Sequence, residues 1–239
     1  MPPASAYSNR FLTLAYRRAG RLYDLLVWWA FLPLGGERAC RLEFARWLDV
    51  RPGHRVASLC CGTGSMEPAL LAEQRELSIT GVDLGEGQIR RARQKNQLAG
   101  VSYLLGDARR TGLAAGEFDR VLIVLALHEM NRPDRLSVLG EARRLCTATG
   151  RVLAIEHARP SRRASRLLQS LWWFLWVPGN PETKTSRDLQ RHGLAREMAE
   201  CGLTVLERHT THPDWIEACL AAPRDPSSGD GTSAKGSVP

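Results

Sequence analysis

Apolar runs and amphipathic segments alternate along the chain from residue 50 onward. Five largely apolar runs predict buried strands at 55–60, 77–84, 101–107, 118–130 and 150–157. Segments that mix charged and apolar residues predict helices between them, at 65–74, 85–100 and 133–150. Continuous apolar strands that alternate with helices are typical of a parallel sheet covered by helices on both faces.

The two ends of the chain have a different pattern. Residues 10–48 are expected to be helical, with one helix from Glu37 to Leu48. After the alternating region we expect a tryptophan-rich helix, a helix from Ser186 to Cys201 and two final strands. The expected regions are a helical N-terminal extension or lid (1–50), one doubly wound α/β domain (51–222) and a disordered tail rich in Gly, Ser and Pro (223–239).

The net charge of the chain favours anionic binding partners but does not distinguish between the kinds of anionic partner. Of the 239 residues 44% are hydrophobic, and the formal net charge is +8. This composition supports a full hydrophobic core. The positive charge favours an anionic partner such as nucleic acid, an acidic membrane surface or an anionic substrate.

The cysteines and the apolar stretches argue against a metal site and a membrane span. The six cysteines form no C-x-x-C pair and no Cys/His cluster with zinc-finger spacing, so we expect buried thiols in a reducing compartment and no metal ligands. The first residues lack the pattern of a secretory signal. The longest apolar stretch, Leu25–Leu34, is too short to span a bilayer. We therefore expect a cytoplasmic protein.

Glycines and carboxylates follow three consecutive predicted strands. Gly62 and Gly64 follow the first strand, Asp83 ends the second and Asp107 ends the third. The carboxyl ends of parallel strands meet at one edge of a sheet, where ligands bind, so these residues are expected to share one site. Asp83 comes nineteen residues after Gly64, close to the interval of about 20 residues expected for a carboxylate that binds ribose hydroxyls. The alternative is a turn that needs glycine only for its geometry, with aspartates that cap loops.

The glycine turn lacks the sequence motifs of phosphate-binding sites, and this narrows the kind of ribose-bearing ligand. A dinucleotide fingerprint needs a third glycine at position 67, where the chain has Glu67, and the G-x-x-x-x-G-K-[ST] sequence of a triphosphate site is absent. A ligand without phosphate fits better. S-adenosylmethionine (SAM) is such a ligand, with a ribose, an adenine, an amino-acid tail and a sulfonium.

At these motifs the chain resembles a known family. The sequences VASLCCGTG, ITGVDLGEGQIRRAR, LLGDA and FDRVLIVLALHEM resemble the successive motifs of class I SAM-dependent methyltransferases, most closely the quinone-biosynthesis-like and type 11 group. The resemblance covers about residues 50–222. It implies a Rossmann-like, doubly wound, mostly parallel sheet of seven strands with an antiparallel last strand, and methyl transfer from SAM.

The resemblance also implies roles for single residues. Asp83 would accept hydrogen bonds from the ribose hydroxyls, and Leu84 would pack on the adenine. Asp107 would accept a hydrogen bond from the adenine amino group. The residues expected to bind SAM are Ser58, Cys60, Cys61, Gly62, Thr63, Gly64, Asp83, Leu84, Gly106, Asp107, Ala108 and Leu125.

Four residues depart from the family's pattern. Ser58 stands where an acidic residue that helps hold the cofactor's ammonium is usual, and Cys60 replaces the first glycine. Gly85 and Gln88 replace a common serine and methionine. The ammonium contact is then left to backbone carbonyls or to another residue. These departures motivate one alternative, a SAM-binding partner protein without activity.

Residues at the ends of the fourth and fifth strands are candidates for contact with the methyl acceptor. His128, Glu129 and His157 follow these strands, and a histidine there could act as a general base if the acceptor needs one. The Asn/Asp-Pro-Pro-aromatic sequence of DNA amino-methylating enzymes is absent, which argues against DNA. The positive charge motivates a second alternative, an RNA methyltransferase, although the chain has no recognisable RNA-binding module.

Two apolar segments favour a small hydrophobic or aromatic acceptor, such as a quinone precursor, a lipid or a specialised metabolite. Tyr23 lies in YDLLVWWAFL, in the extension that covers the active site of related enzymes. Residues 161–176 combine arginines with an apolar stripe, which suits a membrane interface or a hydrophobic substrate, while a lid packed on the sheet is the alternative. We expect Tyr23, Trp172 and Trp176 to belong to the lid or acceptor site, and we expect peripheral contact with the inner face of the membrane.

Overall fold

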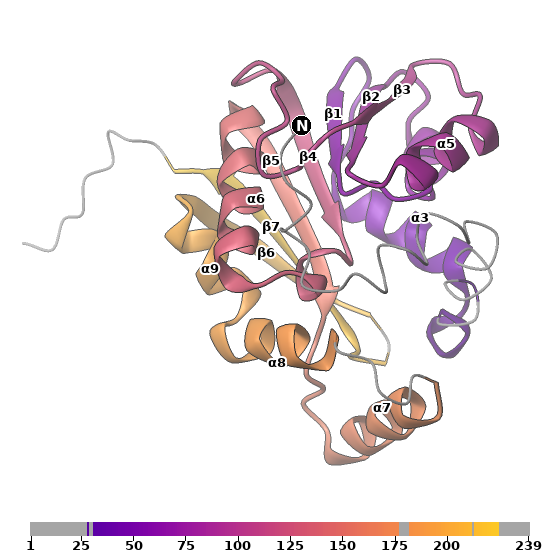
Figure 1. Ribbon diagram of the computed structural model, residues 1–239, viewed down its shortest axis with the longest axis vertical. Coiled ribbons are helices and arrows are strands. Elements are labelled where there is room, and N and C mark those ends of the chain that lie inside the picture. Colours follow the sequence, from indigo (N-terminus) through magenta and orange to yellow (C-terminus); the bar gives the residue numbers. More distant parts are fainter. Residues whose placement is uncertain (1–27, 29–30, 177–181, 212, 225–239) are drawn as a thin grey trace, which may run out of the picture.

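The computed structural model describes residues 28, 31–176, 182–211 and 213–224 of the chain (Figure 1). Tyr23, with most of the predicted extension and tail, lies outside the described residues. Trp172 and Trp176 belong to a described helix, but their side chains lie outside the described part.

Seven strands form one mixed sheet. In the sheet their order is β3-β2-β1-β4-β5-β7-β6. β1 to β5 pair in parallel, and β7 runs antiparallel to both β5 and β6. The predicted fold class is confirmed. The strands are β1 (Arg55–Leu59), β2 (Ser78–Asp83), β3 (Val101–Leu105), β4 (Phe118–Val124), β5 (Cys146–His157), β6 (Leu203–Thr210) and β7 (Ile216–Pro223).

Helices cover both faces of the sheet (Figure 1). One face packs against α3 (Glu37–Trp47), α4 (Glu67–Glu73) and α5 (Glu86–Lys95). The other face packs against α6 (Arg132–Leu145), α8 (Glu182–His192) and α9 (Leu194–Glu200). Helix α7 (Arg163–Trp176) lies beyond the end of the sheet (Figure 1).

The strands read as continuous apolar runs because both faces of the sheet are buried. In β1, Val56 packs on the side of α3 and α4, whereas Ala57 and Leu59 pack on the side of α6. Alternating side chains of one strand thus enter two cores. Helix α3 belongs to the first core through Cys40 and Phe44.

The bounds of three predicted elements differ clearly from those expected from the sequence. β4 ends at Val124 and does not reach Met130, because Leu125 has a φ of 50° and turns the chain into a 3₁₀ helix over Leu127–Glu129. The helix expected from Ser186 to Cys201 is two helices, α8 and α9, separated by Gly193 with a φ of 83°. β5 begins at Cys146, four residues earlier than expected from the apolar pattern.

The described residues contain neither a group of metal-binding side chains nor a membrane-spanning helix. All six cysteines are free thiols. Within the described part of the chain, no group of three His, Cys, Asp or Glu residues is arranged to hold a metal ion. No helix among the described residues is long and apolar enough to cross a membrane.

A fully buried arginine joins three helices on one face of the sheet. The Arg135 guanidinium in α6 donates to both carboxylate oxygens of Glu197 in α9, at 2.8 and 2.7 Å, and to Asp188 in α8 at 2.8 Å. It also donates to the Met130 carbonyl at 2.9 Å. Glu197 is fully buried as well, so each charge depends on the other for its compensation.

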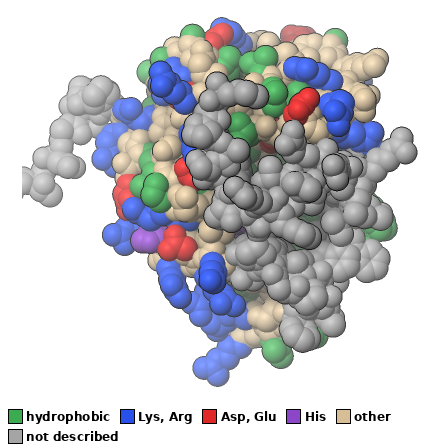
Figure 2. Space-filling view, in the orientation of Figure 1, with side chains coloured by type: hydrophobic (Ala, Val, Ile, Leu, Met, Phe, Trp, Pro, Cys, Tyr) green, Lys and Arg blue, Asp and Glu red, His purple; other side chains and the backbone are tan. Residues whose placement is uncertain are grey.

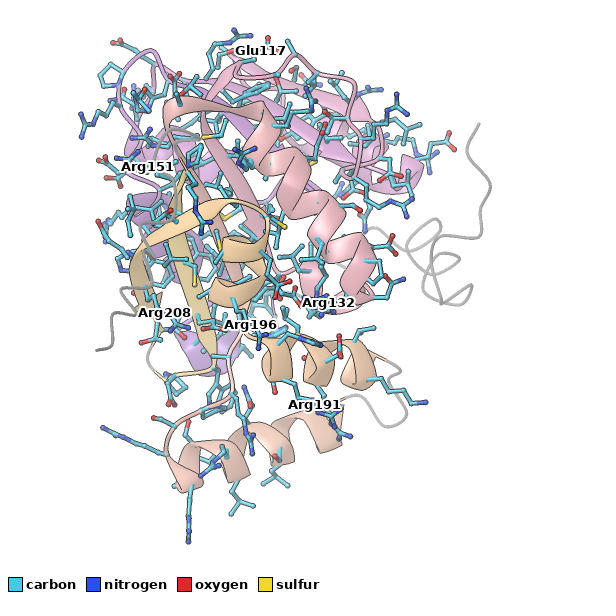
Figure 3. All side chains as sticks on the ribbon, turned by 90° about the vertical axis from the view of Figure 1, so that its left-hand side faces the viewer. Glu117, Arg132, Arg151, Arg191, Arg196 and Arg208 are labelled. Atoms are coloured by element: carbon cyan, nitrogen blue, oxygen red, sulfur yellow. The ribbon has the colours of Figure 1, made fainter. Side chains whose placement is uncertain are left out.

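We expect Arg135→Met to lower the free energy of unfolding by about 3–5 kcal/mol, because Glu197 would stay buried without its main partner. Chemical denaturation measures this change. The control is Arg196→Ala in α9 (Figure 3), whose side chain is 74% exposed and pairs with Glu200; it should cost less than about 1 kcal/mol. A similar loss in the two variants would contradict the importance of the buried pair.

Candidate active site

Backbone and side-chain hydrogen bonds tie together the carboxyl ends of β1, β2 and β3. The Cys61 amide donates to the Val82 carbonyl at 3.1 Å, and the Gly62 amide donates to the Asp83 carboxylate at 2.9 Å. The Gly106 amide donates to the Asp83 carbonyl at 3.0 Å. Asp83 therefore joins the loops after β1 and β3, and the three motifs form one continuous rim.

The two glycines of the loop after β1 have different environments. Gly62 has a φ of 56°, and a Cβ added there would meet no atom within 4 Å, so this side of the loop is open. Gly64 has a φ of 71°, and a Cβ there would come within 2.5 Å of the Tyr103 hydroxyl and 2.6 Å of the Asn96 amide. Gly62 thus presents bare backbone toward open space, while Gly64 allows close packing behind the loop.

Cys60 lies at the centre of the rim in a backbone conformation that favours glycine. Its φ of 56° is in the left-handed region, which explains why glycine is usual at this position in the resembling family. Burial raises the pKa of the Cys60 thiol, and the carboxylates of Asp83, Glu129 and Asp107 raise it further. Carboxylates from three strand ends therefore act electrostatically on this point, in a chain with a net charge of +8.

The Asp83 carboxylate holds the loops and keeps acceptor capacity. One oxygen accepts from Gly62 and the other from the Gly85 amide at 2.7 Å. Each carboxylate oxygen has two lone pairs, so each can accept one more hydrogen bond. Burial raises the pKa of Asp83, and the Gly85 and Gly62 amides oppose the rise. Beside it, Leu84 is exposed at the rim.

The Asp107 carboxylate is engaged by Arg109. The guanidinium donates to both of its oxygens at 2.6–3.0 Å, the Arg109 amide donates to Oδ1 at 2.9 Å, and the same guanidinium reaches Asp134 at 2.7 Å. Burial alone would raise the pKa of Asp107, but Arg109 more than offsets this and the pKa lies below its usual value. Contact between Asp107 and an adenine amino group stays a prediction, and it requires Arg109 to release one oxygen.

A buried carboxylate also holds the turn after β4. Glu156, near the end of β5, accepts from the amides of Ala126 at 2.8 Å and Leu127 at 2.6 Å. Its second oxygen lies 2.8 Å from Nδ1 of His128. The His128 ring packs edge-on against His157, with 4.6 Å between ring centroids. The three candidates for acceptor contact thus lie together, with His128 and Glu129 in the turn and His157 beside it.

Glu156 sets the hydrogen position on the His128 ring. Burial would raise the pKa of Glu156, but His128 opposes this and the pKa is lowered, so the carboxylate is charged and can only accept. Nδ1 of His128 then carries the hydrogen, and in the neutral ring Nε2 carries the lone pair. Burial lowers the pKa of His157 to about 3, so this neighbouring ring is neutral at pH 7.

Glu67, the first residue of α4, is fully buried directly after the glycine loop. Its carboxylate makes no well-formed hydrogen bond, although the hydroxyl groups of Ser58 and Tyr103 lie near it. Burial raises the pKa of Glu67, and the nearby Ser58 hydroxyl opposes the rise only in part. An acidic group is therefore present beside Ser58, although position 58 itself lacks one.

The described residues predicted for cofactor and acceptor all lie at the carboxyl ends of β1 to β5. Several observations fit a ligand with a ribose and an ammonium: the open side of Gly62, the spare lone pairs of Asp83 and the buried carboxylate of Glu67. Sequence reasoning missed Glu67, Arg109 and Glu156. Glu156 carried a usable signal, since it is an acidic residue inside an apolar strand that ends at the same rim.

The part of the sequence that forms this rim is similar to known methyltransferases. Residues 56–150 match the sequence family described as a methyltransferase domain. An uncharacterized methyltransferase of Synechocystis sp. is 28% identical over 193 residues, which make up 79% of this chain and 84% of that protein. A ubiquinone/menaquinone biosynthesis C-methyltransferase of Acidiphilium cryptum is 30% identical over 67% of this chain and 64% of its own length. The chain thus spans less than two thirds of this second relative.

A solved structure shares the fold. The magnesium protoporphyrin IX methyltransferase of Synechocystis, with bound SAH, superposes with a TM-score of 0.63 at 16% identity, covering 90% of this chain and 98% of that one. The motif order, the sheet topology and the matched family agree. The chain thus carries a methyltransferase domain at residues 56–150, in the fold of the SAM-dependent methyltransferases.

Proposed function

We propose that the chain transfers the methyl group of SAM to a small hydrophobic or aromatic acceptor held beside His128. The observation that carries this proposal is that the Gly62–Asp83 rim and the His128–Glu156 pair lie at adjacent strand ends of one sheet. The relative from Acidiphilium cryptum, whose name refers to ubiquinone and menaquinone biosynthesis, supports an acceptor of the quinone type.

In the proposed complex, Asp83 accepts hydrogen bonds from the ribose hydroxyls while it keeps the glycine loop in place. Gly62 lets the backbone approach the amino-acid tail. SAM supplies an electrophilic methyl group on a positively charged sulfur. The carboxylates that act on Cys60 make the rim electrostatically suited to bind that charge. The charge is lost from the sulfur when the methyl leaves, so these carboxylates favour binding of the cofactor and not the transfer step.

His128 is the proposed general base. As the acceptor's nucleophilic atom forms its bond to the methyl carbon, the carbon–sulfur bond breaks and its electron pair stays on sulfur. The proton that the acceptor loses goes to Nε2 of His128, and the charged Glu156 stabilises the resulting imidazolium through Nδ1. His157, neutral at pH 7, contributes ring surface beside this position without a competing positive charge.

Glu67 is the proposed partner of the cofactor's ammonium. The acid that the family has at position 58 is a serine here, and Glu67 brings a buried carboxylate to the neighbourhood of that serine. An ammonium would add a charged hydrogen-bond donor to a carboxylate that has only neutral hydroxyl groups near it.

Asp83→Asn should weaken SAM binding by about tenfold to a hundredfold, because an amide replaces one carboxylate oxygen with a donor that faces the Gly62 or Gly85 amide. Isothermal titration calorimetry with SAM measures the change. Glu86→Gln, which alters an exposed carboxylate three residues away, is the matched control and should bind normally. Equal affinity in both variants would refute the role of Asp83.

Incubation with methyl-labelled SAM and fractionated cell extract should place label in the fraction soluble in organic solvent. His128→Asn should lower kcat with the labelled acceptor by about 10²–10⁴-fold, and Glu156→Gln should lower it by a smaller factor and change the pH profile. SAM affinity should be unchanged in both variants. Label only in RNA or protein, or a normal kcat for His128→Asn, would contradict the proposal.

Glu67→Gln should weaken SAM binding by about tenfold, equal to about 1.4 kcal/mol, without destabilising the free protein. Folding raises the pKa of Glu67 above its usual 4.5, so wild-type stability decreases as the pH rises from that value toward the raised pKa. The glutamine variant lacks this decrease and should be at least as stable at pH 7. Thermal unfolding with and without SAM separates the two effects. A variant that is less stable when free yet binds SAM normally would show a structural role alone.

A further inference from the structure

The outer side of α7 carries three largely exposed leucines. Leu167, Leu168 and Leu171 are 72%, 59% and 51% exposed. They share one side of the helix, since residues one and four apart lie within one apolar stripe. A surface helix normally turns such a stripe toward the core. The alternative of a lid packed on the sheet is therefore wrong for these three side chains.

Polar contacts hold the opposite side of α7 against the protein. The amide and hydroxyl of Ser161 donate to Asp214 at 2.7 and 2.8 Å, and the Ser165 hydroxyl donates to the same carboxylate at 2.7 Å. The Gln169 side chain donates to the Ala158 carbonyl at 3.2 Å. Ser165 and Gln169 are one turn apart, so these contacts fix the rotation of the helix and keep the leucines outward.

Basic residues flank the apolar stripe. Arg159, Arg162, Arg163 and Arg166 lie in or just before α7, and the sequence has no acidic residue from Arg159 to Trp176. Within the described residues, the ion pairs are formed by other arginines and not by these four. In Figure 2, basic and hydrophobic side chains lie close together at the lower end of the molecule, where α7 is found.

Helix α7 lies at an end of the molecule that the sheet does not reach (Figure 1). Figure 3 shows several of the drawn side chains of α7 projecting away from the rest of the protein, with Arg191 of α8 on the side nearest to α7. The helix has 14 residues, a length of about 21 Å, which allows it to lie in an interface but not to cross a bilayer. Its sequence continues after Leu171 with tryptophan, phenylalanine and leucine only, the residues common on the apolar face of helices that lie in a membrane interface.

We propose that α7 docks the protein on a membrane surface that carries anionic lipid headgroups. The leucines enter the boundary between headgroups and acyl chains, and the arginines bind the lipid phosphates. A surface that only bound nucleic acid would need the arginines but not the outward leucines. A purely apolar partner would leave the arginines without a function.

Membrane docking would bring the protein to the lipid phase, where a hydrophobic acceptor is concentrated. This benefit of docking rests on the proposed function. Binding itself needs neither SAM nor the acceptor. It is therefore measured with vesicles and the full chain alone, so that failure of docking and failure of methyl transfer are separate results.

The test is co-sedimentation with phosphatidylcholine vesicles that contain or lack phosphatidylglycerol. We expect binding only when phosphatidylglycerol is present, and weaker binding as salt is added.

Arg162→Gln should lower the partition coefficient about fivefold, the effect of one basic residue near an anionic surface. The triple variant Leu167→Gln, Leu168→Gln, Leu171→Gln should lower it at least tenfold. Leu206→Gln, at a leucine of β6 that is 49% exposed, is the matched control and should bind like the wild type.

Three results would overturn the proposal. The first is no binding to anionic vesicles at low salt by the folded wild type. The second is equal binding by the triple leucine variant, which would reduce the interaction to charge alone. The third is a wild-type dimer in analytical ultracentrifugation that becomes monomeric in the triple variant, which would assign the leucines to a second copy of the chain. Circular dichroism confirms that each variant is folded.

Discussion

The candidate site depends on one hydrogen bond, from the Gly62 amide to the carboxylate of Asp83. Parallel strands deliver their ends to one edge of the sheet, but they do not by themselves fix the loops that follow. Asp83 does so from the middle of the three strands, since its side chain holds the loop after β1 and its carbonyl holds the loop after β3. A carboxylate with two oxygens can hold a loop and still face a ligand. The same side chain can therefore serve the fold and the cofactor.

Glu156 repeats this arrangement at the other half of the rim. It accepts two backbone amides of the turn after β4 and orients His128. Both carboxylates stand at strand ends, both are bound by backbone N–H groups, and both lie near Cys60. The protein as a whole is basic, yet carboxylates gather at its candidate site. This separation of charge allows one molecule to suit a cationic cofactor at the rim and an anionic surface elsewhere.

Much of this arrangement could be predicted because its determinants are local in the sequence. Strands buried on both faces read as unbroken apolar runs, and Gly62, Asp83 and Asp107 mark where three of them end. The end of β4 was not predictable in this way, because Leu125 to Leu127 continue the apolar pattern into a turn. The partners of Glu156 are about thirty positions away, so no local pattern reveals them. Periodicity also identified the leucine stripe of α7 but not its direction, which depends on Asp214.

The backbone at Cys60 has a consequence for the flexibility of the loop. A residue with a Cβ at a φ of 56° is held in a sparsely populated conformation, at a cost of about 1 kcal/mol or more. Glycine would adopt it freely, but glycine would also allow the empty loop to sample many other shapes. The cysteine allows fewer of those shapes. The loop therefore gives up little conformational entropy when a ligand arrives, and part of the ordering that binding requires is completed when the chain folds.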